Sequence, residues 1–571
     1  MTAAVPMSSA AVTSSSHPDA TARAMWRNSG QCRGFVLTCV TLVAALIGDA
    51  VDAQNADSFL DADRSTIPYR DTPFNGRLEC HDLTSRTSAE FSVLTARLEQ
   101  SDARTPDHCR ITGVIPAEII FEVNLPLAWN GRFYMYGNGG FAGHPPSEQA
   151  NVRNQALRHG FATAYTNTGH DARREPGATF AHDNLQKTVD YLFRAVHLTA
   201  IYAKDLIADY YGRPVDYSYW DGCSMGGRQG MLSAQRFPED FDGIVAGAPA
   251  LDFTGTMLSY AWQSRAMSGM TLRPDAVNLL AERVYERCDP LDGLRDGLID
   301  DPRNCDFDPA LHLPRCSEDG SRTDCFTPQE IGVLQKLYSG PRRDARNLHP
   351  GVLPGTEALG LVRSPDGIER RSRGWDPWLL RNEGPGFQQL MVESYLKYLA
   401  FEIDDPDYEL HRFPFETEPE GLDPITLELL DAKVTDLRQF RQRGGKMITY
   451  FGWGDAAINP LPMVQYYESL DAAMGSSPHD FYRLYMIPGM FHCDGGVGAD
   501  EADFMTPIIE WVESGKEPHA IPGRHTEDGK VKFSRPQCPY PQVAHYKGTG
   551  STDLADNFEC ALPDASSDTL P

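Results

Sequence analysis

Three absences narrow what this 571-residue chain can do. Positive charge is scarce: 52 Lys and Arg face 79 Asp and Glu, so the net charge is −27. Nucleic acid and anionic membranes carry the same sign of charge, and repulsion excludes both as expected partners. No Asn-x-Ser/Thr sequon occurs, so N-glycosylation is not expected. Apart from one apolar run near the N-terminus, no segment is apolar over a sufficient length to cross a bilayer.

That apolar run is typical of an export signal. Arginines precede residues 35–47, and the small-residue pattern Val51-Asp52-Ala53 follows them. The run is too short for a membrane span, and its flanks are those of a secretory signal peptide. We expect residues 1–53 to be a leader and signal peptide, with translation starting at Met1 or Met25. We expect the mature protein to be secreted or periplasmic, with no membrane association after cleavage.

Cysteine usage agrees with export. Removing the leader discards two of the 12 cysteines and leaves an even number. In an exported chain an even count indicates disulfides rather than scattered buried thiols. The remaining cysteines are Cys80, Cys109, Cys223, Cys288, Cys305, Cys316, Cys325, Cys493, Cys538 and Cys560.

Strand-like and helix-like segments alternate over much of the mature chain, which predicts an α/β fold with parallel strands. Strands are predicted at 119–123, 133–136, 161–165, 217–220, 244–246, 447–451 and 481–487. Helices are predicted at 189–211, 228–236 and 504–513.

One long interval breaks this alternation. Residues 251–440 are rich in Pro, Gly, Asp and Arg and show no regular succession of strands and helices. We interpret them as a domain inserted into an α/β core made of residues 54–250 and 441–571. The segment after Pro522 is polar and shows little periodicity, and we expect its two cysteines to staple it.

The most informative segment is residues 219–228, with the sequence YWDGCSMGGR. It combines a strand, the pattern Gly-x-Ser-x-Gly and the start of a helix. This order is typical of a nucleophile elbow, a sharp turn that exposes a serine hydroxyl at the end of a sheet. The five-residue pattern alone is weak, but its strand and helix context favours a serine esterase with Ser224 as the nucleophile.

A serine hydroxyl needs a base to remove its proton. In α/β hydrolases the chain order is serine, acid, histidine. Asp455 follows the predicted strand at 447–451, and His492 follows the one at 481–487. Carboxyl ends of parallel strands meet at one edge of a sheet, so we predict Asp455 as the acid and His492 as the base.

Two other features bear on this assignment. His170 is a rival base, but it precedes the serine, so we assign it to scaffolding or to the pocket wall. Cys223 directly precedes the predicted nucleophile, and Cys493 directly follows the predicted base. This placement suggests a disulfide that holds the two catalytic segments together.

An oxyanion hole requires two backbone donors. We predict that one is the N–H of Met225, after the nucleophile, and that the other comes from the glycine-rich residues 137–140. Gly139 or Gly140 is the expected donor. A plain turn is the alternative for this glycine-rich stretch.

Closely spaced acidic residues follow Cys288. The carboxylates of Asp289, Asp292 and Asp296, with the carbonyl oxygens of Leu294 and Leu298, form a set of hard donors suited to Ca²⁺. The spacing is not that of an EF-hand, and a solvated acidic turn explains the same residues equally well. Any ion held there is expected to be structural, because the loop is far in sequence from the predicted triad.

These residues resemble a known family. Cys223-Ser224, Asp455 and His492-Cys493 are similar to the CS-D-HC motif of the tannase and feruloyl esterase family. The glycine-rich loop GNGGFAG, the elbow GCSMGGRQG and the acidic loop extend the resemblance over essentially the whole mature chain. It implies an α/β-hydrolase core with a large inserted lid domain, residues 251–440 here, that holds Ca²⁺ and shapes substrate specificity.

The resemblance also implies disulfide pairing and a substrate class. The implied disulfides are Cys223–Cys493, Cys288–Cys305, Cys316–Cys325 and Cys538–Cys560, which leaves Cys80–Cys109. We expect small esters of aromatic acids as substrates. Among the activities of the family, we rank feruloyl esterase first, tannase second and mono(2-hydroxyethyl) terephthalate hydrolase third. We expect no organic cofactor. We expect the protein to be a monomer or a homodimer.

The lid offers side chains that substrate could contact. Its candidate ring contacts are Trp375, Trp378, Phe387 and Tyr395, and its candidate carboxylate partners are Arg371, Arg373 and Arg381. The rival interpretations of the whole chain are a serine peptidase on the same fold and a catalytically inactive binding protein stabilised by Ca²⁺.

Overall fold

The computed structural model describes residues 58–69, 73–102, 105–270, 272–317, 324–363, 369–381, 384–417 and 419–563. The predicted leader and signal peptide lie outside the described residues. No helix within the described part of the chain is long and apolar enough to span a membrane.

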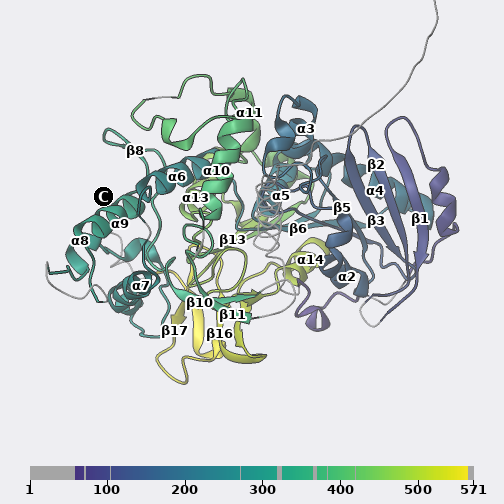
Figure 1. Ribbon diagram of the computed structural model, residues 1–571. Helices are drawn as coiled ribbons and strands as arrows, with labels where there is room; N and C mark the ends of the chain where they lie inside the picture. The colour runs from purple at the N-terminus through teal and green to yellow at the C-terminus, as the bar shows by residue number, and fades with distance from the viewer. Residues whose placement is uncertain are drawn as a thin grey trace, which may run out of the picture. The chain divides into compact units, whose positions relative to one another are not determined.

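A nine-stranded sheet forms the centre, in the order β1-β2-β3-β5-β4-β6-β7-β12-β13 (Figure 1). Its strands are β1 (Ser92–Glu99), β2 (His108–Ile115), β3 (Ile119–Pro126), β4 (Arg132–Tyr136), β5 (Ala162–Thr166), β6 (Tyr217–Cys223), β7 (Gly243–Gly247), β12 (Lys446–Gly452) and β13 (Tyr482–Ile487). Neighbours from β5 to β13 are parallel, as predicted. The first three strands are antiparallel, and β3 is antiparallel to β5.

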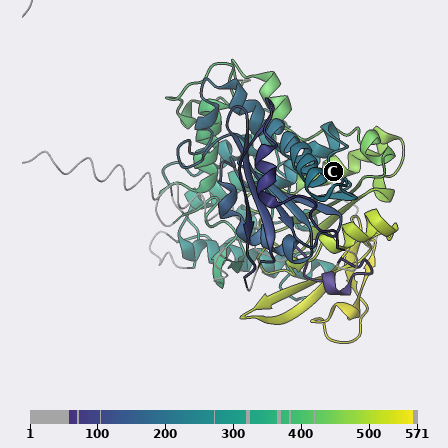
Figure 2. The ribbon, with the colours of Figure 1, turned by 90° about the vertical axis from the view of Figure 1, so that its right-hand side faces the viewer.

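The parallel strands are apolar on both faces because helices cover both. In β4, Phe133 and Met135 join one hydrophobic cluster, whereas Tyr134 and Tyr136 join the other. The first cluster packs α4 (Ala195–Tyr211), α5 (Met225–Arg236) and α13 (Leu461–Met474). The second packs α2 (Ala150–Arg158) and α14 (Met505–Ser514). Figure 2 shows the N-terminal strands, in purple and blue, facing the viewer.

One local prediction needs correction, and two strands were not predicted. The helix predicted at 189–211 is divided into α3 (Leu185–Val189), a π-helical turn (Asp190–Arg194) and α4. Periodicity of apolar residues does not distinguish a π turn from an α turn, because both keep the chain helical. Strands β1 and β2 were not predicted. The exposure of β1 does not alternate and its register shifts between Val93 and Thr95, whereas burial in β2 does alternate.

The inserted segment is mainly helical, with two short hairpins. Its elements are α6 (Phe253–Ala266), α7 (Pro274–Cys288), α8 (Pro309–His312), α9 (Pro328–Ser339), β8 (Arg342–Arg343), β9 (Arg346–Asn347), β10 (Leu359–Arg363), β11 (Glu369–Arg373), α10 (Phe387–Tyr398), α11 (Pro424–Leu430) and α12 (Arg438–Gln442). A third hydrophobic cluster surrounds Leu280, Leu334 and Trp375. Phe253 of α6 and Tyr395 of α10 instead join the cluster that packs against the sheet. The boundaries of a separate lid domain therefore stay a prediction.

The C-terminal segment forms small sheets. Its strands are β14 (Glu501–Ala502), β15 (Ile521–Glu527), β16 (Lys530–Gln537), β17 (Val543–Tyr546) and β18 (Phe558–Ala561). β14, β15 and β16 form one antiparallel sheet, and β17 pairs with β18. These yellow strands lie along the lower edge of the view in Figure 1.

Candidate active site

The predicted nucleophile elbow is present. β6 ends at Cys223, α5 begins at Met225, and Ser224 between them has φ 62° and ψ −121°. A positive φ is unfavourable for a residue with a Cβ and is kept only where its surroundings enforce it. Here the Ser224 N–H donates to the Gly247 carbonyl oxygen at 2.9 Å. A Cβ placed on Gly222 would lie 2.7 Å from the Gly226 backbone, so the turn requires glycine. Ser224 is half-buried.

The predicted acid and base meet. Asp455 follows β12 and His492 follows β13, and His492 Nδ1 lies 2.7 Å from Asp455 Oδ2. The other carboxylate oxygen accepts the N–H groups of Ala457 and Ile458, both at 2.8 Å. Both partners are buried, with Asp455 2% and His492 8% exposed. Three hydrogen bonds thus fix the carboxylate, and the carboxylate fixes the ring so that Nε2 remains available for chemistry.

A disulfide joins the segment that contains Ser224 to the segment that contains His492. Cys223 and Cys493 are bonded, with an S–S distance of 2.01 Å and Cα atoms 5.9 Å apart. Each is the immediate chain neighbour of Ser224 or His492, so the bond brings together residues separated by about half of the chain. The remaining four predicted pairings are also confirmed: Cys80–Cys109, Cys288–Cys305, Cys316–Cys325 and Cys538–Cys560.

The glycine-rich loop lies against the elbow. It follows β4, and its residues Gly139 and Gly140 are half-buried. Met225 is the first residue of α5, so its N–H has no acceptor within the helix. Tyr191, in the π-helical turn, donates its hydroxyl to the Gly140 carbonyl oxygen at 3.3 Å. A Cβ placed on Gly226 of α5 would lie 3.1 Å from the Gly137 Cα, so the two segments predicted to donate to an oxyanion are neighbours.

One aromatic residue of the inserted segment contacts the imidazole of His492. The ring of Trp378 stands edge-on to His492, with centroids 5.2 Å apart and an interplanar angle of 83°, and it is half-buried. The other three candidates, Trp375, Phe387 and Tyr395, are buried. Trp375 and Tyr395 lie in hydrophobic clusters, and Phe387 packs against Trp378 with ring centroids 6.1 Å apart. Trp375 is fully buried and donates from its ring nitrogen to Thr356 Oγ1. Trp375 therefore packs within the inserted segment, whereas Tyr395 packs against the sheet.

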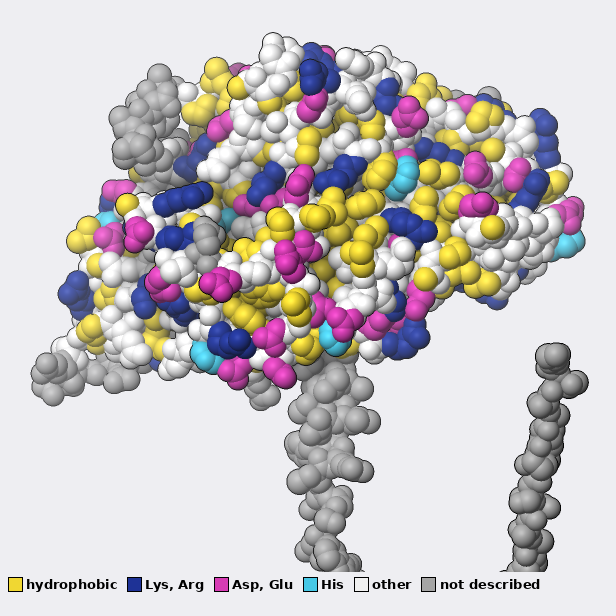
Figure 3. Space-filling view, turned by 90° about the horizontal axis from the view of Figure 1, so that it is seen from above, with side chains coloured by type: hydrophobic (Ala, Val, Ile, Leu, Met, Phe, Trp, Pro, Cys, Tyr) yellow, Lys and Arg dark blue, Asp and Glu magenta, His cyan; other side chains and the backbone are white. Residues whose placement is uncertain are grey.

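The lid arginines are mostly engaged. Arg371 pairs with Glu527 at 2.6 Å, and Arg373 pairs with Asp376 at 3.1 Å. Arg381 lies over the Phe387 ring. On the face seen in Figure 3, Lys and Arg side chains are interspersed with Asp and Glu, so no patch of one sign dominates that face.

His170, the rival histidine, is a packed residue. It is 1% exposed and stacks on Phe180 with ring centroids 4.0 Å apart. Burial lowers the pKa of His170 to about 4, which keeps the imidazole neutral. A Cβ placed on Gly143 would lie 2.5 Å from its Nε2, so the ring supports the end of the glycine-rich loop.

The predicted calcium loop follows α7. Asp289 Oδ1 accepts the N–H of Asp296 at 3.2 Å, and Asp292 Oδ1 accepts the N–H of Leu294 at 2.8 Å. Asp296 also pairs with Arg535 of β16 at 2.6 Å. Asp289 and Asp292 therefore accept N–H groups of their own loop, whereas Asp296 also pairs outside it.

Like charges crowd in this loop. Burial, together with the charges of Asp296 and Asp289, raises the pKa of Asp292 to about 6. Burial and the carboxylates of Asp292 and Asp296 raise the pKa of Asp300 well above its usual value. Asp300 was not predicted as part of the group, although it follows Leu298 by only two residues.

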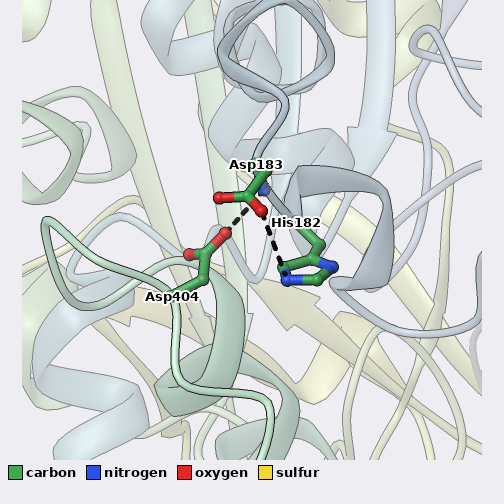
Figure 4. Close-up of side chains that lie close together, drawn as sticks. All are labelled: His182, Asp183 and Asp404. Carbon is green, nitrogen blue, oxygen red and sulfur yellow. Dashed lines mark hydrogen bonds and ion pairs between the residues drawn. The ribbon is translucent and has the colours of Figure 1, made fainter.

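In another acidic group the potential metal-ligand atoms lie closer together. Among the residues that the structure describes, only His182, Asp183 and Asp404 bring three potential metal-ligand side chains within 4.8 Å of one another (Figure 4). The Asp183 N–H donates to Asp404 Oδ2 at 2.7 Å, and His182 Nε2 lies 3.7 Å from Asp183 Oδ2. His182 and Asp183 are exposed, so water solvates most of the group.

Comparison with known proteins identifies the family. A family model described as "Tannase and feruloyl esterase" matches residues 105–561. The chain belongs to the tannase and feruloyl esterase family. Membership makes it a carboxylic ester hydrolase, and the expected α/β-hydrolase fold is confirmed.

Individual relatives match over most of their length. The chain is 33% identical over 526 residues to the mono(2-hydroxyethyl) terephthalate hydrolase of Piscinibacter sakaiensis, which covers 81% of this chain and 86% of the relative. It is 29% identical over 540 residues to feruloyl esterase B of Aspergillus niger, covering 87% and 96%. The crystal structure of feruloyl esterase B from Aspergillus oryzae is similar with a TM-score of 0.70 at 25% identity, covering 84% of this chain and 99% of that one.

Proposed function

We propose that this chain hydrolyses esters of aromatic acids through a Ser224–His492–Asp455 triad and an acyl-enzyme. The observation that carries the proposal is the buried Asp455–His492 hydrogen bond beside a disulfide that ties the histidine loop to the serine elbow. A base oriented by a buried carboxylate next to a serine on a strained turn is the arrangement that activates a hydroxyl.

The proposed reaction assigns a role to each of these residues. Nε2 of His492 removes the Ser224 proton as Oγ attacks the ester carbonyl, and Asp455 stabilises the resulting imidazolium. The N–H groups of Met225 and of Gly139 or Gly140 stabilise the oxyanion. His492 then protonates the departing alcohol. A water molecule, deprotonated by the same ring, releases the acid from Ser224.

An aromatic acyl group suits the lid wall. The half-buried Trp378 ring beside His492 provides an apolar surface where an aromatic acid would lie next to the scissile bond. We rank a feruloyl ester first, a galloyl ester second and a terephthalate monoester third. Relatives named feruloyl esterase B and mono(2-hydroxyethyl) terephthalate hydrolase support this class of substrate.

Export is part of the proposal. Five disulfides persist in an oxidising compartment and are rare in a reducing cytosol. Together with the signal-like N-terminus they support a secreted or periplasmic enzyme, which we expect to be a monomer or homodimer.

We also propose a structural Ca²⁺ in the loop after α7. Its donors would be Asp289, Asp292 and Asp296 with the carbonyl oxygens of Leu294 and Leu298. The chemistry of the donor set suits Ca²⁺, because all its atoms are hard oxygens and its carboxylates are of like charge. In the described structure its three carboxylates do not lie within 4.8 Å of one another, so binding would draw them together. Chelation is expected to lower the melting temperature, and added Ca²⁺ to restore it. An unchanged melting temperature in chelator would remove the metal from the proposal.

The deciding experiment compares the mature protein with Ser224→Ala on three esters: methyl ferulate, methyl gallate and mono(2-hydroxyethyl) terephthalate. We expect the variant to lose about 10⁴-fold or more in kcat. The preferred ester identifies the acyl group. Absence of activity on all three would contradict the aromatic-ester assignment, and equal activity of the variant would contradict the triad.

A further inference from the structure

In the proposed reaction, the two oxyanion donors come from separate segments of the chain. One is the start of α5, and the other is the loop of residues 137–140 after β4. Strands β4 and β6 are paired up to Tyr136 and Asp221, and the Gly137 N–H then donates to the Asp221 carbonyl oxygen at 2.9 Å. Beyond this bond the sheet no longer determines how far the loop lies from α5.

A backbone contact brings the two segments together. A Cβ placed on Gly137 would lie 2.5 Å from the Gly226 Cα, and one placed on Gly226 would lie 3.1 Å from the Gly137 Cα. The loop and the first turn of α5 therefore touch without intervening side chains. Such a contact sets a closest approach, but it does not prevent the loop from sliding or lifting.

Two amide side chains supply that restraint. The Asn138 N–H donates to Gln229 Oε1 at 3.0 Å, and Gln229 Nε2 donates to Asn138 Oδ1 at 3.1 Å. Gln229 lies on α5, one helical turn after Gly226. Asn138 Nδ2 also donates to Tyr165 Oη at 2.7 Å and to the Thr166 carbonyl oxygen at 2.9 Å. Asn138 and Gln229 are each 3% exposed.

The orientation of both amides is determined by their partners. The Thr166 carbonyl oxygen can only accept, so Nδ2 of Asn138 must face it and Oδ1 must face Gln229. The Asn138 backbone N–H can only donate, so Gln229 must present Oε1 to it and Nε2 to Oδ1. A carboxylate at position 229 cannot satisfy both demands, because one of its oxygens would face Oδ1, which is also an acceptor.

We propose that Asn138 and Gln229 are positioning residues that hold the loop donor of the oxyanion hole in register with the Met225 N–H on α5. The pair connects the loop to the same helix that begins directly after the nucleophile. A change in this register moves one donor relative to the oxyanion while leaving the triad itself in place. The proposal rests on the proposed function, because it requires an oxyanion to form at Ser224.

The test is Gln229→Glu, with Gln235→Glu as a matched control. Gln235 lies on the same helix and donates to the Ala432 carbonyl oxygen and to Tyr466 Oη, so its replacement also removes an amide donor. It makes no hydrogen bond to the glycine-rich loop among the described residues. Steady-state kinetics on the best ester and thermal unfolding are measured for both variants, and Asn138→Asp tests the other side of the pair.

We expect Gln229→Glu and Asn138→Asp to lower kcat about 10- to 100-fold with KM nearly unchanged, since misplacing a catalytic donor by a fraction of its contact distance affects the transition state most. We expect Gln235→Glu to keep the wild-type kcat. Should Gln229→Glu not fold, Gln229→Met removes both bonds without adding charge, and the same fall in kcat is expected.

Two results would overturn the proposal: a folded Gln229 variant with wild-type kcat, or an equal loss in the Gln235 control. Both are distinct from failure of the proposed function, in which the wild-type protein itself would show no Ser224-dependent esterase activity.

Discussion

The edge of the sheet and the inserted segment present their side chains in different ways. At the sheet edge, Ser224, Asp455 and His492 each follow the end of a parallel strand, and the structure holds them by backbone hydrogen bonds and a disulfide. In the inserted segment most of the aromatic residues pack inward, and Trp378 alone of the four candidates lies against His492. The parallel strands thus position the Ser224, Asp455 and His492 side chains. The inserted segment mainly packs on itself and contributes the Trp378 ring beside His492.

The largest expected effect is a loss of kcat when Asp455, at the edge of the sheet, is replaced. Asp455→Asn keeps the size of the side chain but removes the charge that stabilises the imidazolium and orients His492. We expect kcat to fall about 10⁴-fold. Thermal unfolding checks that the variant is folded. A loss smaller than tenfold would show that the buried carboxylate does not serve the reaction.

Removing the disulfide tests whether the link between the two segments matters for catalysis. In Cys223→Ser/Cys493→Ser we expect kcat to fall about 100-fold and the free energy of unfolding to fall by about 2–5 kcal/mol. Cys316→Ser/Cys325→Ser, in the inserted segment, is the matched control and is expected to keep kcat. Equal kcat in both double variants would contradict a catalytic contribution of the Cys223–Cys493 bond.

Trp375 and Trp378 lie three residues apart in the insertion, and replacing each one separates a packing role from a role beside His492. We expect Trp378→Ala to lower kcat/KM about 10-fold on an aromatic ester, with little change in stability. We expect Trp375→Ala to lower the free energy of unfolding by about 3–5 kcal/mol, because its fully buried ring leaves a cavity. Urea unfolding and kinetics on the same samples separate the effects. The reverse pattern would mean that the roles of the two rings are exchanged.

The smallest effect is a pH dependence of stability within the insertion. Burial raises the pKa of Glu357 from 4.5 to about 7. The folded state therefore binds a proton more tightly than the unfolded state, and the stability gained from it is lost as pH rises from about 4.5 through about 7. In Glu357→Gln we expect the free energy of unfolding to fall less steeply over this range. An unchanged slope, measured by urea unfolding at several pH values, would contradict the shift.

Prediction from sequence succeeded where local rules apply. The elbow was recognisable because glycine, serine and glycine occupy a strand-to-helix turn that other residues would obstruct. The strands at 447–451 and 481–487 were found because buried parallel strands are continuously apolar. The placement of Cys223 and Cys493 suggested one disulfide, and the family resemblance implied this pairing and three others. Cys80–Cys109 was left by elimination, because composition and spacing alone leave pairings open.

Prediction was weaker where contacts are distant in sequence. The π-helical turn was missed because its apolar spacing resembles that of an α-helix. The Asn138–Gln229 pair was not singled out, although both residues lie in segments that sequence analysis had marked. An amide is common in any loop or helix, and its reciprocal partner is about 90 residues away.

The sequence by itself determined that Ser224, Asp455 and His492 follow three parallel strands in this order and lie at one edge of the sheet. Those properties depend on backbone preferences and on strand periodicity, which act over a few residues. Only the tertiary structure decided which tryptophan faces the imidazole, which arginines are already paired and how the glycine-rich loop is held on α5. Such choices depend on burial and on hydrogen bonds between segments far apart in the chain, for which no local pattern exists.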